Sequence, residues 1–371
     1  MDFSYDEDQQ AIISLASQIF RDKASHERQR QIEQGTGPRF DRALWAALAK
    51  AGLLGLAVPE EHGGAGFGFL TVAAVLEQAG RCTAPVPLLE TLVLGALPIA
   101  RFGSAAQQAA WLPKLGEGSC VLTAALMDES PDPEAPTVRA QLDGAAATLH
   151  GTKICVPAAQ LADRIVVSAS LASSEVGLFL LDPRGIGVTV KPVVTTAGTP
   201  EAVVELQAAP AEVLARPREG REALAWLLDR AWAAQSAVAL GVCEAALAMT
   251  AEYTKTRKQF DQPIAMFQAV GHRAADAYVD VEAIRLTALQ AAWRLDAGLP
   301  ARAQVALAKF WAAEAGQRVV HAAQHLHGGI GVDRDYPLHR FFTHAKQLEL
   351  ALGGATPQLL RIGRLLADAP V

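Results

Sequence analysis

Three cations and a phenylalanine gather in one short stretch between two long apolar segments. The stretch reads YTKTRKQFDQPIAMFQ from 253 to 268, and it contains Lys255, Arg257, Lys258 and Phe260. An arginine side chain presents a planar set of donors that suits phosphate oxygens, and an aromatic ring can cover a flat heterocycle. The same cations would also stabilise the negative end of a helix dipole without binding a ligand. The stretch therefore predicts either a site for a phosphorylated, ring-bearing ligand or an ordinary helix end.

A second stretch closes another long helical pattern with three glycines, and it reads QHLHGGIG from 324 to 331. Glycines let the backbone approach a ligand closely, although at a helix end they more often form a C-cap. No strand precedes these glycines, so they are not a dinucleotide-binding fingerprint. His325 and His327 are metal ligands by residue type alone. Because no further histidine or carboxylate has a supporting spacing, the sequence predicts no metal site.

The two stretches together resemble the acyl-CoA dehydrogenase family, which shows an R-x-Q/F-G-x-P-I-x-x-F-Q block and then a Q-x-H-G-G-x-G block. Here the blocks read RKQFDQPIAMFQ and QHLHGGIG, followed by Asp335-Tyr336-Pro337, Ala345-Lys346 and the closing RIGRLL. The opening MDFSYDEDQQAIISLASQIF and the segment AVPEEHGGAGFGFLTVAAVLEQAGR at 57–81 are similar to the family's first domain. The resemblance covers essentially the whole chain.

The resemblance implies an FAD-dependent oxidoreductase of lipid or steroid catabolism, which dehydrogenates an acyl-CoA thioester between its alpha and beta carbons. Members of the family pass the electrons to an electron-transferring flavoprotein. Their middle domain holds the flavin ring. Their C-terminal motifs reach across a subunit interface and hold the adenosine diphosphate half of the FAD in the neighbouring chain.

Several site residues are implied by the match of the first block. By this resemblance, Arg257 contacts the pyrophosphate of FAD and Phe260 packs at its adenosine side. Gln268 falls in the F-Q match and is expected to assist. These three residues are the C-terminal part of a cofactor site that a second chain would complete.

The glycine block and the last helix supply the other implied contacts. The family glutamine lies three residues before the first glycine, a place that His325 takes here, and Gln324 lies one residue earlier. Both are therefore candidates, beside Gly328 and Gly329. Thr356 matches the threonine of the family's E-G-T segment and is a candidate contact to a cofactor phosphate or to the flavin.

The segments that bind the flavin ring depart from the family pattern. Where the family has a T-E-P-x-x-G-S-D-like segment, this chain reads LMDESPD at 126–132. Where the family has W-x-T/S, this chain reads KICVP at 153–157, without the aromatic ring or the hydroxyl. Because a flavin needs donors near its ring edges to stabilise the reduced form, we expect the ring site to be degraded.

The position of the catalytic base is also altered. The reaction needs a base, usually a glutamate whose pKa is raised by burial, in the E-G-T segment or on an earlier helix. Gly354 stands at the first position and Ala231 at the second. Asp229 is the remaining weak candidate, whereas Glu244 and Glu349 are interpreted as structural helix charges.

The pattern of apolar residues indicates how these segments are positioned. Helical spacing in 9–20 and 42–51 gives way after residue 118 to short β-branched runs, and long helical patterns return after residue 215. The predicted strands are 147–150, 153–156, 164–168, 176–181, 187–192 and 202–206. The predicted fold class is α+β multidomain, with an N-terminal helical domain (1–118), a small antiparallel β domain (119–215) and a C-terminal four-helix bundle (216–371). Pro263 is expected to begin a bundle helix.

Composition limits the functional classes. The 371 residues are 51% hydrophobic and 19% charged, with a formal net charge of −6, so a nucleic-acid partner is not expected. The four cysteines are widely spaced, which predicts thiols in a reducing compartment. The acidic start predicts no signal peptide, and no apolar run of membrane length is expected. The predicted location is the cytoplasm, away from membranes.

Three functional hypotheses follow. In the first, the chain supports dehydrogenation of an acyl-CoA substrate by completing the FAD site of a catalytic paralogue, as in α2β2 heterotetramers of steroid side-chain degradation, whose non-catalytic subunit it resembles. In the second, it is a self-sufficient homotetrameric dehydrogenase with a displaced base. In the third, it is a flavin-free scaffold that binds acyl-CoA or a partner protein without chemistry.

Overall fold

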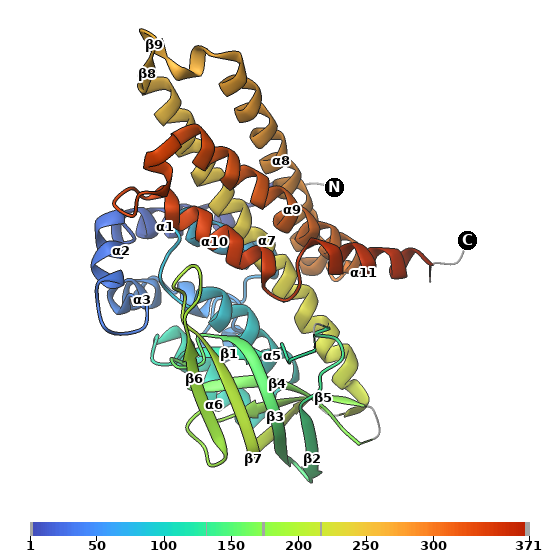
Figure 1. The fold of residues 1–371 in the computed structure, drawn as a ribbon. Helices are drawn as coiled ribbons and strands as arrows, with labels where there is room; N and C mark the ends of the chain where they lie inside the picture. The colour runs from blue at the N-terminus through green and yellow to red at the C-terminus, as the bar shows by residue number, and fades with distance from the viewer. Residues whose placement is uncertain (1–2, 131, 173–174, 216, 368–371) are drawn as a thin grey trace. The chain divides into compact units, whose positions relative to one another are not determined.

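The computed structural model describes residues 3–130, 132–172, 175–215 and 217–367 (Figure 1). The chain divides into two compact units that each combine distant segments. The first consists of Met1–Gln29, Ala73–Ala84 and Trp232–Val371, and the second of Arg30–Val72 and Pro85–Ala231. The boundaries between the three predicted domains stay predictions, and each unit is described by itself below.

The N-terminal third is helical, as predicted. Its helices are α1 (Glu7–Lys23), α2 (His26–Glu33), α3 (Arg42–Lys50), α4 (Phe69–Arg81), α5 (Leu97–Phe102) and α6 (Ala105–Gly116), with short turns η1 (Leu53–Gly55) and η2 (Glu60–His62). A π-helical segment, η3 (Glu90–Ala96), precedes α5. At the start of α1, the Asp6 carboxylate accepts from Gln9 N while the Gln9 side chain accepts from Asp6 N, a capping box that satisfies two donors at the helix end.

Seven strands form the β part of the second unit. They are β1 (Leu122–Ala125), β2 (Arg139–Asp143), β3 (Ala146–Pro157), β4 (Arg164–Ser170), β5 (Val176–Leu181), β6 (Val188–Val193) and β7 (Glu201–Ala215). The pairings run β1–β4–β2–β3–β7–β5, and β5 pairs again with β4. This second pairing closes the sheet on itself, so the domain is a small barrel, with β6 added at β7.

The strand predictions were right in kind and incomplete in detail. Two predicted strands are halves of β3, which continues through register shifts at Leu149/Gly151 and Lys153/Val156. Strands β1 and β2 were not predicted, and β1 lies parallel to β4 rather than antiparallel. Parallel pairing requires a long connection between the strands, whereas the prediction assumed short strands joined by tight turns.

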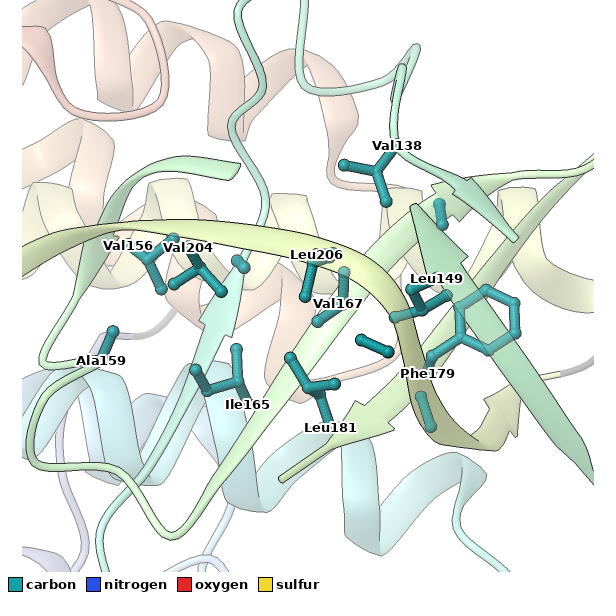
Figure 2. Close-up of a cluster of buried hydrophobic side chains, with 14 of the residues drawn as sticks. Val138, Leu149, Val156, Ala159, Ile165, Val167, Phe179, Leu181, Val204 and Leu206 are labelled. Carbon is teal, nitrogen blue, oxygen red and sulfur yellow. The ribbon is translucent and has the colours of Figure 1, made fainter. Parts of the chain in front are cut away.

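The barrel encloses a core of apolar side chains, most of them valine, leucine, isoleucine and alanine. Figure 2 shows Ile165 and Val167 from β4, Phe179 and Leu181 from β5, and Leu206 from β7 directed toward a common interior. The strand β5 is buried along its whole length. This packing fixes the edge of β3, where the residues aligned with the family's flavin segment lie.

Long helices make up most of the first unit. They are α7 (Pro217–Thr256), α8 (Gln268–Asp296), α9 (Arg302–His327), α10 (Leu338–Leu350) and α11 (Ala355–Ala367). Side chains of α7, α8 and α9 share one apolar core that includes Leu240, Ile284 and Val319. Helices α10 and α11 pack on α9. The helical bundle predicted for the C-terminal region is therefore present.

Two expectations about these helices are corrected or explained. Pro263 does not begin an α-helix, because it lies in the short strand β9 and precedes a 3-10 turn (Ile264–Met266), and α8 starts at Gln268. Against the expectation of no apolar run of membrane length, a stretch of α7 is apolar enough to span a membrane by length and composition. However, 78% of that window is buried inside the fold, as in the core helix of a globular protein.

Helices α4 and α7 cross at two glycines. A Cβ atom at Gly80 would lie 2.2 Å from the carbonyl oxygen of Val238, and one at Gly241 would lie 2.0 Å from that of Glu77. Both distances are shorter than any tolerated contact, so only glycine permits the two backbones to approach this closely. The many small residues of α7 thus serve close helix packing at this crossing.

Candidate functional site

The segment from 257 to 267 is a short hairpin at one end of the helical unit (Figure 1). It consists of β8 (Lys258–Gln259) and β9 (Gln262–Pro263), which pair antiparallel. The turn residues Phe260 and Asp261 have φ values of 52° and 64°. Both residues adopt the left-handed region that two-residue hairpin turns require, and this conformation is unusual for phenylalanine. A strained residue held by its surroundings is a mark of functional sites.

The side chain of Phe260 is exposed to solvent rather than buried. Its side chain is 87% exposed and meets Phe267 edge-on, with ring centroids 6.2 Å apart. Burying an aromatic ring releases substantial free energy, so an exposed one at a strained turn indicates that something else covers it in the working assembly. The fold alone does not explain this ring.

Arg257 lies exposed at the end of α7, immediately before the hairpin. Its backbone is fixed, because its N–H donates to Tyr253 O at 2.8 Å and its carbonyl accepts from Ile264 N at 2.8 Å. Within the described residues its guanidinium has no ion-pair partner, whereas the nearby Lys255 pairs with Glu252 at 2.7 Å. The two cations therefore differ, since Lys255 is used within the helix and Arg257 is available to a ligand.

The hairpin and the glycine block are joined by an aromatic stack. The rings of Tyr253 and His327 are stacked with centroids 4.3 Å apart. His327 Nδ1 lies 2.8 Å from the carbonyl oxygen of Ala323, and Nε2 lies 3.1 Å from the hydroxyl of Tyr336. Nδ1 must donate to the carbonyl, so in a neutral ring Nε2 accepts from the tyrosine. Burial lowers the pKa of His327, which keeps the ring in this neutral form.

His327 is accordingly a structural link between the two motifs. Among the described residues, no group of histidine, cysteine, aspartate and glutamate side chains is arranged to hold a metal ion. The exposed His325 points away from the buried His327 face. The sequence did not predict this role, because nothing in the spacing pairs residue 253 with residue 327.

The glycines that follow His327 present open backbone. Gly328 has φ 64° and ψ −141°, a conformation close to glycine-only, at the end of α9. A Cβ atom at Gly328 or Gly329 would meet no heavy atom within 4 Å, so no internal packing requires these glycines. By contrast, a Cβ at Gly331 would lie 2.9 Å from Gln324 O, which explains that glycine by packing alone.

The remaining predicted contacts fall into two places. Gln324 is half-buried in the last turn of α9, and Gln268 is exposed in the first turn of α8. Thr356 lies at the start of α11, beyond α10. Because α10 has 13 residues and a helix rises 1.5 Å per residue, it spans about 20 Å. The structure thus brings Arg257 and the glycines together through Tyr253 and His327, and separates Thr356 from them.

The β-domain segments that align with the flavin-ring motifs are held by a buried ion pair. Lys153 is fully buried, and its Nζ lies 2.5 Å from Asp128 Oδ1 and 3.0 Å from Ser168 Oγ. Asp128 Oδ2 accepts a further bond from Thr137 N at 2.5 Å. Burial lowers the pKa of Lys153 to about 8, against the opposing effect of Asp128. The two opposite charges of Lys153 and Asp128 thus neutralise each other in the interior.

Cys155 lies in the KICVP segment, which stands where the family has W-x-T/S, and it is exposed with φ 48° at an irregular part of β3. Burial of the thiol, with a smaller effect from Glu201, raises its pKa. A neutral thiol is a weak hydrogen-bond donor. The neighbouring Ile154 uses its N–H on Met127 O at 3.0 Å. This edge offers neither the aromatic wall nor the hydroxyl of the family.

The candidate base positions hold no available carboxylate. Ala231 is fully buried, and Gly354 lies in the turn before α11. Glu244 is held between Arg81 and Arg285, and Glu349 pairs with Lys346 at 2.5 Å. The interpretation of these two glutamates as structural charges fits their contacts.

The weak candidate Asp229 is buried in α7 and takes part in polar interactions there. A base must reach the proton that it removes, and a carboxylate already engaged within the fold is less able to do so. Its role in catalysis stays a prediction, and the described geometry gives no further support for it.

Two ionisable groups with shifted pKa values, the half-buried Glu90 and the buried Lys309, were not predicted from the sequence. Glu90 opens the π-helical segment η3, and burial is the main cause that raises its pKa to about 7, with a smaller contribution from Glu201. Lys309 is buried in α9 and donates to Leu348 O at 2.5 Å, and burial lowers its pKa to about 7 against the effect of Glu349. Neither stands in a motif, and a lysine within a helical pattern normally indicates a solvated face.

Comparison with known proteins places this geometry in a family. Residues 6–119 match the acyl-CoA dehydrogenase N-terminal domain, and residues 218–367 match the acyl-CoA dehydrogenase C-terminal domain. The acyl-CoA dehydrogenase FadE27 of Mycobacterium tuberculosis is 44% identical over 381 residues, which cover 100% of both chains.

Solved structures agree. A chain in the crystal structure of the ChsE4–ChsE5 complex from Mycobacterium tuberculosis superposes with a TM-score of 0.94, at 44% identity and over 100% of both chains. A chain of the Tcur3481–Tcur3483 steroid acyl-CoA dehydrogenase, studied as a variant, gives 0.93 at 44% identity and 98% coverage of both chains. With matches at both ends of the sequence and likeness along its whole length, this protein belongs to the acyl-CoA dehydrogenase family, whose cofactor is FAD.

Proposed function

We propose that this chain is the non-catalytic subunit of a heterotetrameric acyl-CoA dehydrogenase, in which it completes the FAD site of a catalytic partner chain. The observation that carries the proposal is a contrast within one molecule. The residues aligned with the contacts to the adenosine diphosphate half of FAD are exposed and make no ion pair within the described chain. The residues aligned with the contacts to the flavin ring differ from the family's residues and contact one another.

The C-terminal residues fit an FAD pyrophosphate and adenosine. Arg257 offers a guanidinium that no described carboxylate neutralises, and Gly328 and Gly329 offer backbone that a ligand can approach without a clash. Phe260 supplies an exposed ring beside them. When FAD is bound, it accepts the hydride that the dehydrogenation removes. The role of this chain is to hold the far end of that cofactor and fix its orientation.

The β-domain residues do not fit a flavin ring. Lys153 is paired with Asp128, and the segment 153–157 has neither the aromatic ring nor the hydroxyl of the family's motif. No carboxylate stands at Gly354 or Ala231. We therefore assign no proton transfer to this chain. One explanation, a division of labour between two chains, accounts for the altered ring site and the altered base position together.

The relatives support a heteromeric assembly and a bulky substrate. The ChsE4–ChsE5 and Tcur3481–Tcur3483 structures are complexes of two different chains, and the second is a steroid dehydrogenase. We infer an acyl-CoA substrate of similar class for the assembly that contains this chain. The small residues of α7 at its crossing with α4 are explained by close helix packing, so they are no evidence for the size of the substrate. We further propose a cytoplasmic location, consistent with four free cysteines, and electron transfer to an electron-transferring flavoprotein.

The test is the ratio of flavin to protein. Expressed alone, the chain should bind little FAD. Co-expressed with a catalytic paralogue of the acyl-CoA dehydrogenase family, it should yield a yellow mixed tetramer with dehydrogenase activity. A lone chain with one FAD per subunit and full turnover would overturn the proposal in favour of a self-sufficient homotetramer. In that case Asp229→Asn would be examined first, for loss of turnover with FAD retained.

A further control addresses a scaffold without flavin chemistry. If the chain were such a scaffold, Arg257→Ala would change neither the flavin content nor the activity of any assembly. Our proposal expects a large loss of flavin from the mixed tetramer, which separates the two functions in one measurement.

A further inference from the structure

An open cavity of about 790 Å³ lies in the second unit, between helix α3 and the β domain. Its walls are one face of α3, the loop 116–121 at the end of α6, and the segment 160–163 before β4, all of them within the second unit. Strands β1 and β4 are parallel and begin at this end of the barrel, where Leu122 pairs with Arg164. The volume falls within the usual range of small-molecule pockets, roughly 300–1,000 Å³.

The cavity is at the opposite end of β1 from the residues aligned with the family's flavin segment. Val121, on the cavity wall, precedes β1, whereas Met127 follows β1 and bridges to Ile154. The four residues of β1, at about 3.3 Å each, place roughly 13 Å between the two ends. The cavity is therefore a feature that the proposed function does not use.

Hydrogen bonds hold the walls of the cavity in place. The Trp45 indole N–H donates to Gly118 O at 3.0 Å, which fixes the loop after α6 to α3. The Asp163 carboxylate accepts from Val121 N at 3.0 Å and from Arg184 Nη2 at 2.6 Å. Because both oxygens of Asp163 are engaged and Arg184 pairs with it, these two charges maintain the wall.

Two further cations of the lining have no such partner. Arg42, Ala46 and Lys50 follow one another at four-residue intervals on the cavity face of α3. Within the described residues neither cation forms an ion pair, and Arg42 only covers the Phe40 ring at 5.2 Å. Lys50 in the last turn stabilises the helix dipole, but Arg42 is in the first turn, where a cation opposes it. Helix stability therefore does not explain Arg42.

Another wall of the cavity supplies an acceptor that lacks a donor. Gln160 Oε1 is buried, and no described residue donates a hydrogen bond to it. A buried oxygen without a donor lowers the stability of the chain, and such atoms are uncommon in folded proteins. Glu117, exposed on the loop wall, is a second acceptor, and Ser119 Oγ donates to one of its oxygens at 3.2 Å. A donor group on a bound molecule would satisfy Gln160.

We propose that this cavity binds a small dianionic metabolite, a phosphomonoester or a dicarboxylate, that also carries a hydroxyl or amine donor. Its two negative charges match Arg42 and Lys50, whose side chains suit phosphate and carboxylate oxygens. Its hydroxyl or amine donates to Gln160 Oε1. The charged side chains of the lining are three cations and two carboxylates, whereas the whole chain has a net charge of −6, so an anion is attracted to this cavity rather than to the surface in general. The proposal goes beyond the proposed function and does not depend on it.

The test is calorimetric titration of the full chain with glycerol 3-phosphate, malate and glycerol. At least one of the two dianions should bind at millimolar or lower concentration, and which of them binds more tightly identifies the anionic group. Neutral glycerol should not bind. Arg42→Gln with Lys50→Gln should weaken binding about tenfold or more, because charge-assisted hydrogen bonds are lost. Lys23→Gln, at an exposed cation in the last turn of α1, is the matched control and should leave binding unchanged.

Gln160→Met gives a second readout that a structural role would not produce. Removal of an unpaired buried acceptor should leave the melting temperature of the ligand-free chain unchanged or higher, while binding of the dianion weakens severalfold. A lower melting temperature with unchanged binding would mean that Gln160 serves the fold, and it would contradict the proposed contact.

The remaining outcomes also decide the matter. If neither dianion binds the wild-type chain, or if the double variant binds like the wild type, the proposal is wrong. If Lys23→Gln weakens binding as much as the double variant, the attraction is a general effect of charge and the proposal is also wrong. Flavin content plays no part in these measurements, so failure here is distinct from failure of the proposed function.

Discussion

The hairpin with its glycine block and the edge of the β domain are aligned with two halves of one cofactor site. The two regions differ in how far their groups are already engaged in contacts within the chain. At the hairpin, side chains and backbone are exposed, strained and unpaired, as at Phe260 and Gly328. At the β edge, Lys153, Asp128 and Ser168 satisfy one another in the interior. Strained or unpaired groups that lower the stability of the isolated chain indicate a binding site. Buried polar groups that pair with one another stabilise the fold and are not available to a ligand.

The largest expected effect comes from breaking the buried pair at the β edge. Lys153→Met leaves Asp128 charged and buried, which should lower the free energy of unfolding by about 3–5 kcal/mol. Urea denaturation of the isolated chain measures this change. The matched variant Lys153→Met with Asp128→Leu should recover most of the loss, and neither variant should lower the flavin content of the mixed tetramer that still folds.

At the hairpin the expected loss is of binding rather than stability. Arg257→Ala should weaken FAD retention by the mixed tetramer roughly 10- to 100-fold, because a charge-assisted hydrogen bond contributes about 1.5–3 kcal/mol. Flavin absorbance after dialysis measures the effect. Lys255→Ala is the matched control, since Lys255 is paired within α7. Equal losses in the two variants would contradict a specific role for Arg257.

Two groups with shifted pKa values, Lys309 and Glu90, should give opposite responses of stability to pH. Lys309 in the helical unit has a pKa lowered from 10.5 to about 7, so between pH 7 and 10 the unfolded chain binds more protons and stability rises with pH. Glu90 in the β-containing unit has a pKa raised from 4.5 to about 7, so between pH 4.5 and 7 the folded chain binds more protons and stability falls with pH.

Denaturation series across pH check both slopes. Lys309→Met should reduce the rise above pH 7 to the part that Lys153, with a pKa of about 8, contributes, and Glu90→Gln should flatten the fall below pH 7. Each variant is the control for the other, because each should leave the other pH range unaltered. A wild-type stability that does not change between pH 7 and 10 would contradict the assignment for Lys309.

The smallest effect is expected from restoring a hydroxyl to the β edge. Cys155→Thr places a hydroxyl in the segment that departs from the family's motif, but φ 48° disfavours a β-branched side chain, and the aromatic partner and the base stay absent. We expect a loss of about 1 kcal/mol in stability and no flavin absorbance in the isolated chain. A yellow lone chain after this single change would mean that the ring site is nearly intact, and the contrast between the two regions would disappear.

Sequence patterns were most informative where chemistry is local. The charge and turn residues of 253–268 predict a phosphate-binding corner, because donor type and backbone freedom are properties of single residues, and this site stays a prediction. Helices such as α1 and α8 followed from apolar spacing, because that spacing is the condition for burying one face. Strands β1 and β2 were missed, because their pairing depends on partners distant in the chain.

The sequence by itself determined the family resemblance, the helical and β regions, and the absence of a glutamate at Gly354 and Ala231. Only the tertiary structure decided that Tyr253 stacks on His327, that Lys153 is neutralised by Asp128, and that a cavity forms between α3 and the β domain. The physical reason is the same in each case. A residue's type fixes which interactions it can make, but its burial and its neighbours decide which of them it makes, and these come from packing between segments far apart in sequence.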